Sequence, residues 1–480
     1  MFSLVFTVGG RTPAAVCGPL AGLLLAAAVP VATAASDPWQ VGRDLPATPA
    51  GGWVQACEYR PDAALDLAAL VRLALCRNPD TRVSWRQMLA QAERVGAAKA
   101  DRLPSVTLSA GYSSPFGDRE RDEGDSTSAG ASLDWLLYDF GARPASIRSS
   151  ELTLSALRHS HDDSVQAVFA AAVDAYYQWF AADAALTAAR EAETAAGETL
   201  RAADSRMRAG AATREDFLQA QTAQAQARLT TIQSEGDRES ALGAVAVILA
   251  LPASTPVTLL APADAPAVDA AGTPPDWPAL LARSQAQRPD LLAQSLRIDS
   301  ARADHEAAAA AGRPSISFSA RDSVDLDNNS ESGEVGIDAS WPLFTGFRTG
   351  YRTRAAAQQV EIEKANYEKL LQSASLELWQ AWQSMRTAGA TVTAADALVD
   401  SAQESLRAAR ARYGAGLGDL INVLNAQSTL ADARRQQLRA RYDWYRARIA
   451  LARASGELGW SDLAPSGATD AGTAAGDIKP

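Results

Sequence analysis

Two segments of the chain end a helical pattern with a proline and continue with alternating apolar and small polar residues. They read RLPSVTLSAG at 102–111 and GRPSISFSAR at 312–321, and each follows an alanine-rich run. Proline has no amide hydrogen and disfavours the helical conformation of the residue before it, so each segment predicts a helix end followed by a strand. The chain is therefore duplicated internally, and both halves must make the same change from helix to strand.

The spacing of the repeats locates a loop and divides the chain. The prolines above lie 210 residues apart, whereas RMRAGAATREDFLQAQ at 206–221 and RYGAGLGDLINVLNAQ at 412–427 lie 206 apart. The two repeats therefore differ in length by four residues, and the difference must lie in residues 112–135 of the first repeat and 322–341 of the second. Loops tolerate such differences, so a loop is predicted there. The predicted segments are a signal peptide (1–35), an irregular lead-in (36–61), a first repeat (62–251), a proline-rich connector (252–275), a second repeat (276–460) and a disordered tail (461–480).

Each repeat is predicted to hold one pair of strands, at about 105–138 and 315–344. In the first pair Leu133 and Trp135 share one face, whereas Ser132 and Asp134 share the other. Alternation with a period of two indicates strands with one apolar and one polar face. The charged stretches FGDRERDEGDS and DLDNNSES, between the strands of each pair, predict exposed loops.

Helices are predicted for most of the remaining sequence. One helix precedes each strand pair, and a much longer helix with an apolar seam follows it, turns at RAGAA or GAGLG and returns. At about 1.5 Å per residue, each long helix would extend roughly 100 Å, as in a coiled coil. The predicted ranges are 62–103 and 276–312 before the strands, about 142–208 and 347–412 after them, and 213–250 and 418–455 for the returning helices.

The signal peptide and the strands predict an exported membrane protein. After the signal no stretch of about 18 residues is apolar throughout, so strands would have to cross the bilayer. Four strands cannot close a barrel, and open edges are costly in lipid, so several copies must contribute. Two copies would give eight strands and three would give twelve, and the polar inner face favours a water-filled lumen. The net charge of -11 argues against nucleic acid as a partner.

The duplicated order of helix, proline, strand pair and long helix, with both turn motifs, resembles the TolC-type outer-membrane efflux proteins over nearly the whole mature chain. The resemblance implies an α+β membrane protein, in which a trimeric 12-stranded outer-membrane β-barrel with four strands per chain continues into a long α-helical coiled-coil tunnel in the periplasm. It also implies a periplasmic adaptor and an inner-membrane ABC transporter or efflux pump as partners. The type I secretion branch, which includes cyclolysin export, is the most similar. Passive export of a protein toxin or another substrate is therefore expected, with a multidrug efflux duct as the alternative.

The resemblance also implies a gate at the periplasmic mouth of the tunnel. Rings of acidic residues in a D-V-L-D pattern narrow this mouth in the family, whereas Asn422 and Asn425 occupy the two aspartate positions here. Asp216 and Tyr413 match the aspartate and tyrosine of the closing network, but Gly418 stands where the family has an arginine. We therefore expect a mouth that closes more weakly, with a hydrogen bond between Asp216 and Tyr413. The alternative is that both asparagines are simply polar positions facing the lumen.

Other classes of protein fit the sequence less well. No nucleotide-binding, zinc-protease or serine-hydrolase motif occurs, so we expect neither an enzyme nor a cofactor. His159 and His161 in HSHDD would diverge by about 200° on a helix, which predicts a solvent-exposed run and no metal site. DLDNNSESGE at 325–334 lacks the glycine of a calcium loop, which favours an exposed external loop. A periplasmic coiled-coil adaptor would share the long helices but would not need strand pairs suited to lipid.

Cys57 and Cys76 are the two cysteines expected in the mature chain. Export would place them in an oxidising compartment, where a disulfide closing so short a loop would stabilise the protein by roughly 3 kcal/mol. Two separate buried thiols fit the sequence equally well. Labelling of the denatured, unreduced protein distinguishes the two, because two free thiols per chain would exclude the bridge.

Overall fold

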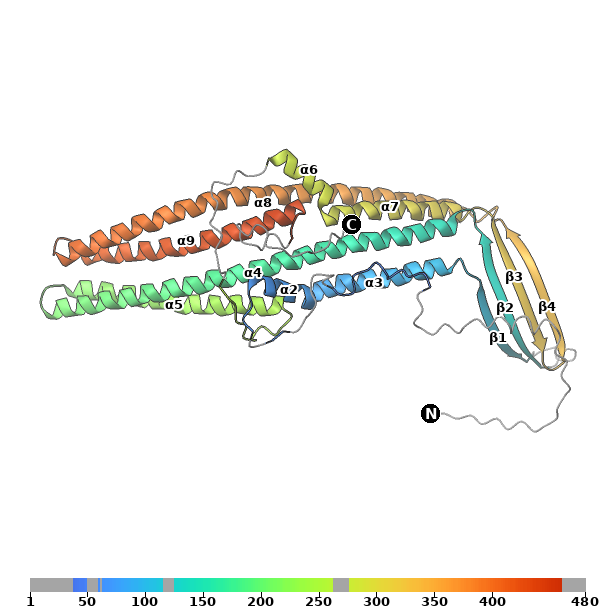
Figure 1. Cartoon of the computed structure of the whole chain (residues 1–480), viewed down its shortest axis with the longest axis horizontal. Coiled ribbons are helices and arrows are strands. Elements are labelled where there is room, and N and C mark those ends of the chain that lie inside the picture. Colours follow the sequence, from blue (N-terminus) through green and yellow to red (C-terminus); the bar gives the residue numbers. More distant parts are fainter. Residues whose placement is uncertain (1–37, 50–58, 61–62, 115–124, 262–275, 460–480) are drawn as a thin grey trace, which may run out of the picture.

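The computed structural model describes residues 38–49, 59–60, 63–114, 125–261 and 276–459. A sheet lies at one end of a long bundle of helices, and the tips of two helical hairpins lie at the other end (Figure 1). The predicted signal peptide and tail fall outside the described residues. None of the described helices is both long and apolar enough to cross a membrane.

The sheet is antiparallel and joins the strands of both repeats in the order β1-β2-β3-β4. The strands are β1 (Ser105–Ser113), β2 (Ser126–Tyr138), β3 (Ser315–Asp325) and β4 (Ser330–Ser340). Across the repeat boundary Leu133 pairs with Ala320 and Trp135 with Phe318, so the predicted apolar faces coincide. β1 and β4 form the two edges of the sheet.

The turn between β3 and β4 is tighter than the sequence predicted. The loop expected over 325–332 is wrong in its second part, because β4 already begins at Ser330. The carboxylate of Asp325 accepts hydrogen bonds from the backbone N–H groups of Asp327 and Asn328, at 3.0 and 3.1 Å. An aspartate that bonds its own backbone in this way closes a short turn.

Each strand pair is followed by a helical hairpin. The hairpins are α4 (Ala142–Arg208) with α5 (Arg214–Ile248), and α8 (Arg348–Gly414) with α9 (Leu420–Ser455). In both repeats the chain enters the long helix through two consecutive residues of positive φ, Phe140 and Gly141 in the first and Gly346 and Phe347 in the second. This conformation is unusual for phenylalanine, so the repeated geometry indicates that the sharp change from strand to helix requires it.

The single helices predicted before the strand pairs are wrong, because each is broken at a proline. The observed helices are α2 (Leu67–Arg77), α3 (Pro79–Ala100), α6 (Trp277–Gln287) and α7 (Pro289–Ala310). Asn78 and Arg288 precede the prolines and have ψ angles of 134° and 122°, which are extended. Proline at the first position of a helix restricts the preceding residue to such a conformation, so one helix ends and the next begins there.

Both breaks contact the end of the returning helix of their own repeat. In the first repeat Asn78 Nδ2 donates to the Ile248 carbonyl at 3.3 Å, and Arg77 Nε donates to the Leu249 carbonyl at 3.1 Å. The last carbonyls of a helix have no partner within it, so these side chains supply the missing donors. The largest buried cluster lies in the same region and includes Phe169 and Tyr176 of α4.

Candidate functional site

The hairpin tips farthest from the sheet hold the residues predicted to form a gate. Both tips turn through a glycine of positive φ, Gly210 at 72° and Gly416 at 74°. At the first tip the Ala211 N–H donates to the Arg206 carbonyl at 2.8 Å, and the second tip has the equivalent bond at 2.9 Å. Glycine adopts this conformation without the penalty of a side chain, so RAGAA and GAGLG both act as helix-ending turns.

Asp216 caps its own helix. Its carboxylate accepts hydrogen bonds from the N–H and the Oγ1 of Thr213, both at 2.9 Å, and Thr213 Oγ1 accepts from the Asp216 N–H at 3.1 Å. This reciprocal pair is a capping box, which satisfies two backbone donors at the start of α5. The expected bond between Asp216 and Tyr413 is not found among the described residues, and the Asp216 carboxylate is bonded to Thr213 instead.

Tyr413 contacts an arginine that the sequence analysis missed. The guanidinium carbon of Arg206 lies 4.4 Å from the centroid of the Tyr413 ring, and its Nη1 donates to the Tyr413 carbonyl at 3.3 Å. Arg206 belongs to α4 and Tyr413 to α8, so this pair joins the tips of the two hairpins. The only signal in the sequence was a basic residue one turn before the first tip, in RMRAG.

Asn422 and Asn425 lie on the exposed side of the first turns of α9. Val423 and Ala426 alternate with them and are buried in a cluster shared with Ala203 of α4. Within the described part of the chain, neither asparagine side chain forms a hydrogen bond. The two amides are thus presented outward from a packed helix, and their place at the mouth of the tunnel remains a prediction.

The prediction that the HSHDD run is solvent-exposed is wrong for His161. His161 is 4% exposed, and its Nδ1 lies 2.8 Å from Ser84 Oγ on α3. Burial lowers the pKa of His161 against the opposing effect of Asp162. His159 points elsewhere and lies 3.7 Å from Asp162. In the described ranges no group of three or more His, Cys, Asp or Glu residues could hold a metal ion.

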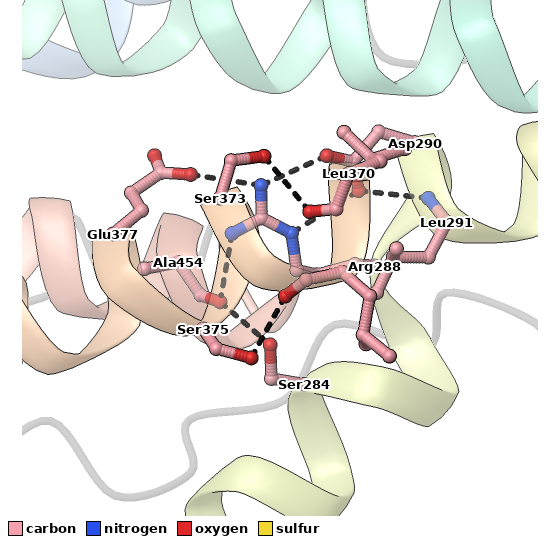
Figure 2. Close-up of polar contacts among 10 residues, drawn as sticks. Ser284, Arg288, Asp290, Leu291, Leu370, Ser373, Ser375, Glu377 and Ala454 are labelled. Carbon is pink, nitrogen blue, oxygen red and sulfur yellow. Dashed lines mark hydrogen bonds and ion pairs between the residues drawn. The ribbon is translucent and has the colours of Figure 1, made fainter. Parts of the chain in front are cut away.

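Arg288 forms the most extensive buried ionic contact of the second repeat (Figure 2). Its Nη2 lies 2.8 Å from carboxylate oxygens of Asp290 and of Glu377 on α8, and its Nη1 donates to the Ala454 carbonyl at 3.3 Å. Burial alone would lower the pKa of Arg288, but the hydrogen bonds that it donates to the carboxylates of Asp290 and Glu377 raise this pKa above the usual range. Arg288 therefore stays charged and joins the α6–α7 break to α8 and to the end of α9.

Cys76 is buried on α2 and is bonded in a disulfide. Cys57 lies outside the described residues, so its pairing with Cys76 remains a prediction.

Solved structures share this fold. The outer-membrane channel OprN superposes with a TM-score of 0.73, at 23% sequence identity, over 85% of this chain and 96% of OprN. The common architecture is that of outer-membrane channels whose helical part extends into the periplasm. The chain belongs to the Outer membrane efflux protein family, whose model matches residues 70–251 and 280–457.

Curated relatives include proteins with different names within this family. Protein CyaE of Bordetella pertussis is 29% identical over 428 residues, which cover 87% of this chain and 89% of CyaE. Outer membrane protein OprJ of Pseudomonas aeruginosa is 27% identical over 419 residues, which cover 80% of this chain and 85% of OprJ.

These similarities confirm the predicted resemblance to TolC-type proteins, the fold class and the outer-membrane location. Each chain contributes four strands and a long helical body to a trimeric channel. The family and the fold are those of passive outer-membrane channels.

Proposed function

We propose that this chain is the outer-membrane duct of a type I secretion system, and that it exports a protein toxin or another substrate passively. The observation that carries the proposal is the similarity to Protein CyaE over 87% of the chain. The alternative is the duct of a multidrug efflux pump, which is supported by relatives such as the solvent efflux pump outer membrane protein SrpC of Pseudomonas putida, 28% identical over 430 residues. Energy would come from an inner-membrane partner in either case.

Deletion of the gene in its source bacterium separates the two roles. For a secretion duct, we expect one or a few proteins to disappear from the culture medium and to return when the wild-type chain is restored. Inhibitory concentrations of dyes and antibiotics should stay within about twofold. Unchanged secreted proteins with increased drug sensitivity would contradict secretion and support drug efflux.

A periplasmic adaptor is the second proposed partner. A groove of about 880 Å³ lies between the two hairpins, lined by residues of α4, α5, α8 and α9. Glu191 and Arg434 form an ion pair of 3.0 Å beside small alanines such as Ala223. Small side chains flanked by charges suit the packing of another helical hairpin, which is the expected shape of an adaptor.

We further propose that Asn422 and Asn425 line the periplasmic mouth in three copies. The support is their exposure on α9 near the tip, beside the contact between Arg206 and Tyr413. Neutral amides would attract cations less than carboxylates at the same positions. A mouth of this kind would be less cation-selective than an acidic one.

A further inference from the structure

The polar face of the sheet is built from very small residues and a few charged ones. Alternate positions on this face are mainly serine and glycine, and side-chain bonds join neighbouring strands, such as Ser319 Oγ to Asp338 Oδ2 at 3.3 Å and Ser323 Oγ to Ser332 Oγ at 2.8 Å. Arg321 is the only basic residue of the four strands. With serine and glycine around it, this arginine is also the longest side chain in the middle of the face.

Arg321 is flanked by acidic residues on both neighbouring strands. The register of the sheet places it opposite Ser132 on β2 and opposite Glu334 on β4. Its Nη2 lies 3.9 Å from Oδ1 of Asp134, one step diagonally along β2. The side chains of Arg321 and Asp134 are 62% and 55% exposed, so both charges reach the solvent on this face.

The opposite face identifies which side meets water in the assembled channel. Large apolar side chains such as Leu108, Val335 and Ile337 are 83%, 72% and 71% exposed in the single chain. In a membrane barrel the apolar face contacts lipid and the polar face lines the lumen. Asp134, Arg321 and Glu334 therefore face the lumen, and three copies repeat them around it.

We propose that Arg321 sets the ion selectivity of the barrel lumen by offsetting the carboxylates of Asp134 and Glu334. At about 0.1 M salt the screening length is roughly 10 Å, so fixed charges on the wall of a water-filled lumen act on passing ions. Because Arg321 is flanked by acidic residues on both neighbouring strands, the lumen attracts cations only moderately. This inference depends on the channel role of the family and not on the identity of the exported substrate.

Reversal potentials across planar bilayers under a KCl gradient test the proposal. We expect Arg321→Ser to raise the ratio of cation to anion permeability by about twofold or more near 0.1 M salt. The effect should shrink near 1 M, where the screening length falls to about 3 Å. The pair Asp134→Asn with Glu334→Gln should shift the ratio in the opposite direction.

Two variants serve as controls. Arg321→Lys keeps the charge and should leave selectivity unchanged. Asp322→Asn removes a charge from the next residue, which pairs with Ala131 and Gly333 on the lipid-facing side, and should also have no effect. If Arg321→Ser and the double variant form channels of wild-type selectivity, the proposal is wrong. Such a result would leave the secretion proposal untouched, because gene deletion tests that separately.

Discussion

Arg288 is the single residue whose loss we expect to destabilise the fold most. Its side chain is only 10% exposed and is bonded to Asp290, which is itself 18% exposed. Removing one partner of a buried ion pair leaves the other charge uncompensated, at a cost of about 3–5 kcal/mol. Arg288→Met should therefore lower the free energy of unfolding by about that amount, measured from the denaturant-induced loss of helical circular dichroism in detergent.

Arg283 offers a matched control for this measurement. It pairs with Glu457 at 3.0 Å, but both side chains are exposed, by 46% and 40%. An exposed ion pair contributes about 1 kcal/mol or less, so Arg283→Met should have little effect. Equal losses in the two variants would show that the buried charge of Arg288 contributes no more to stability than an exposed ion pair.

His161 should make stability depend on pH. Burial lowers its pKa in the folded chain, so the unfolded chain binds the proton more readily. Stability should therefore fall as the pH drops below the ordinary histidine pKa of about 6.5. We expect His161→Gln to show a smaller difference in unfolding free energy between pH 8 and pH 5.5 than the wild type.

Two aspartates next to His161 also have altered pKa values. Burial raises the pKa of Asp162 and of Asp163. Their contribution to the unfolding free energy therefore increases as the pH falls, which is opposite to that of His161, and this increase is complete below the ordinary carboxylate pKa of about 4. Asp163 is present in both proteins and does not respond to His161, so its contribution cancels. The pKa of Asp162 is lowered by His161, so the measured difference belongs to His161 and Asp162 together. Identical pH slopes in the two proteins would mean that His161 is protonated in the folded state without penalty.

At the scale of helices, the contact between Arg206 and Tyr413 holds the tip of α4 against the tip of α8. A cation over an aromatic ring contributes about 0.5–2 kcal/mol, depending on exposure. Arg206→Ala should let the two hairpins separate more readily, and single-channel recording should show a larger conductance or more frequent opening. Arg208→Ala is the control, because Arg208 pairs with Asp204 on its own helix. If both variants behave like the wild type, this contact does not restrain the mouth.

The sequence predicted the elements better than their contacts. The strands were located to within a few residues because period-two alternation and the preceding prolines, Pro104 and Pro314, act locally. The breaks at Asn78 and Arg288 were missed because proline is compatible with the first position of a helix, so the pattern continues across it.

The candidate site was predicted only in part. The two helix-ending turns could be predicted, because Gly210 and Gly416 allow the positive φ that each turn requires. The partners of Tyr413 and His161 come from other helices, and their choice depends on how those helices pack, which no local pattern contains. The role of Asp216 was predictable from the sequence, because Thr213 lies three residues before it and the two residue types fit a capping box.

Our two proposals give the whole channel two separate places that discriminate ions, the lumen around Arg321 and the mouth around Asn422 and Asn425. The mouth is the narrower of the two in our proposal, so charge added there should act more strongly. Asn422→Asp combined with Asn425→Asp would create two rings of carboxylates in the trimer. We expect higher cation selectivity and block by divalent cations added on the periplasmic side, since carboxylate rings attract and bind cations.

The matched control adds the same group at the other end of the molecule. Asn329, an exposed residue in the turn between β3 and β4, lies far from the hairpin tips (Figure 1), and Asn329→Asp should not introduce divalent block. When the double aspartate variant is combined with Arg321→Ser, we expect a further increase in cation selectivity, because an ion passes the mouth and the barrel lumen one after the other. If the double aspartate variant gains neither cation selectivity nor divalent block in single-channel recordings, Asn422 and Asn425 do not line the constriction and the assignment of the gate is wrong.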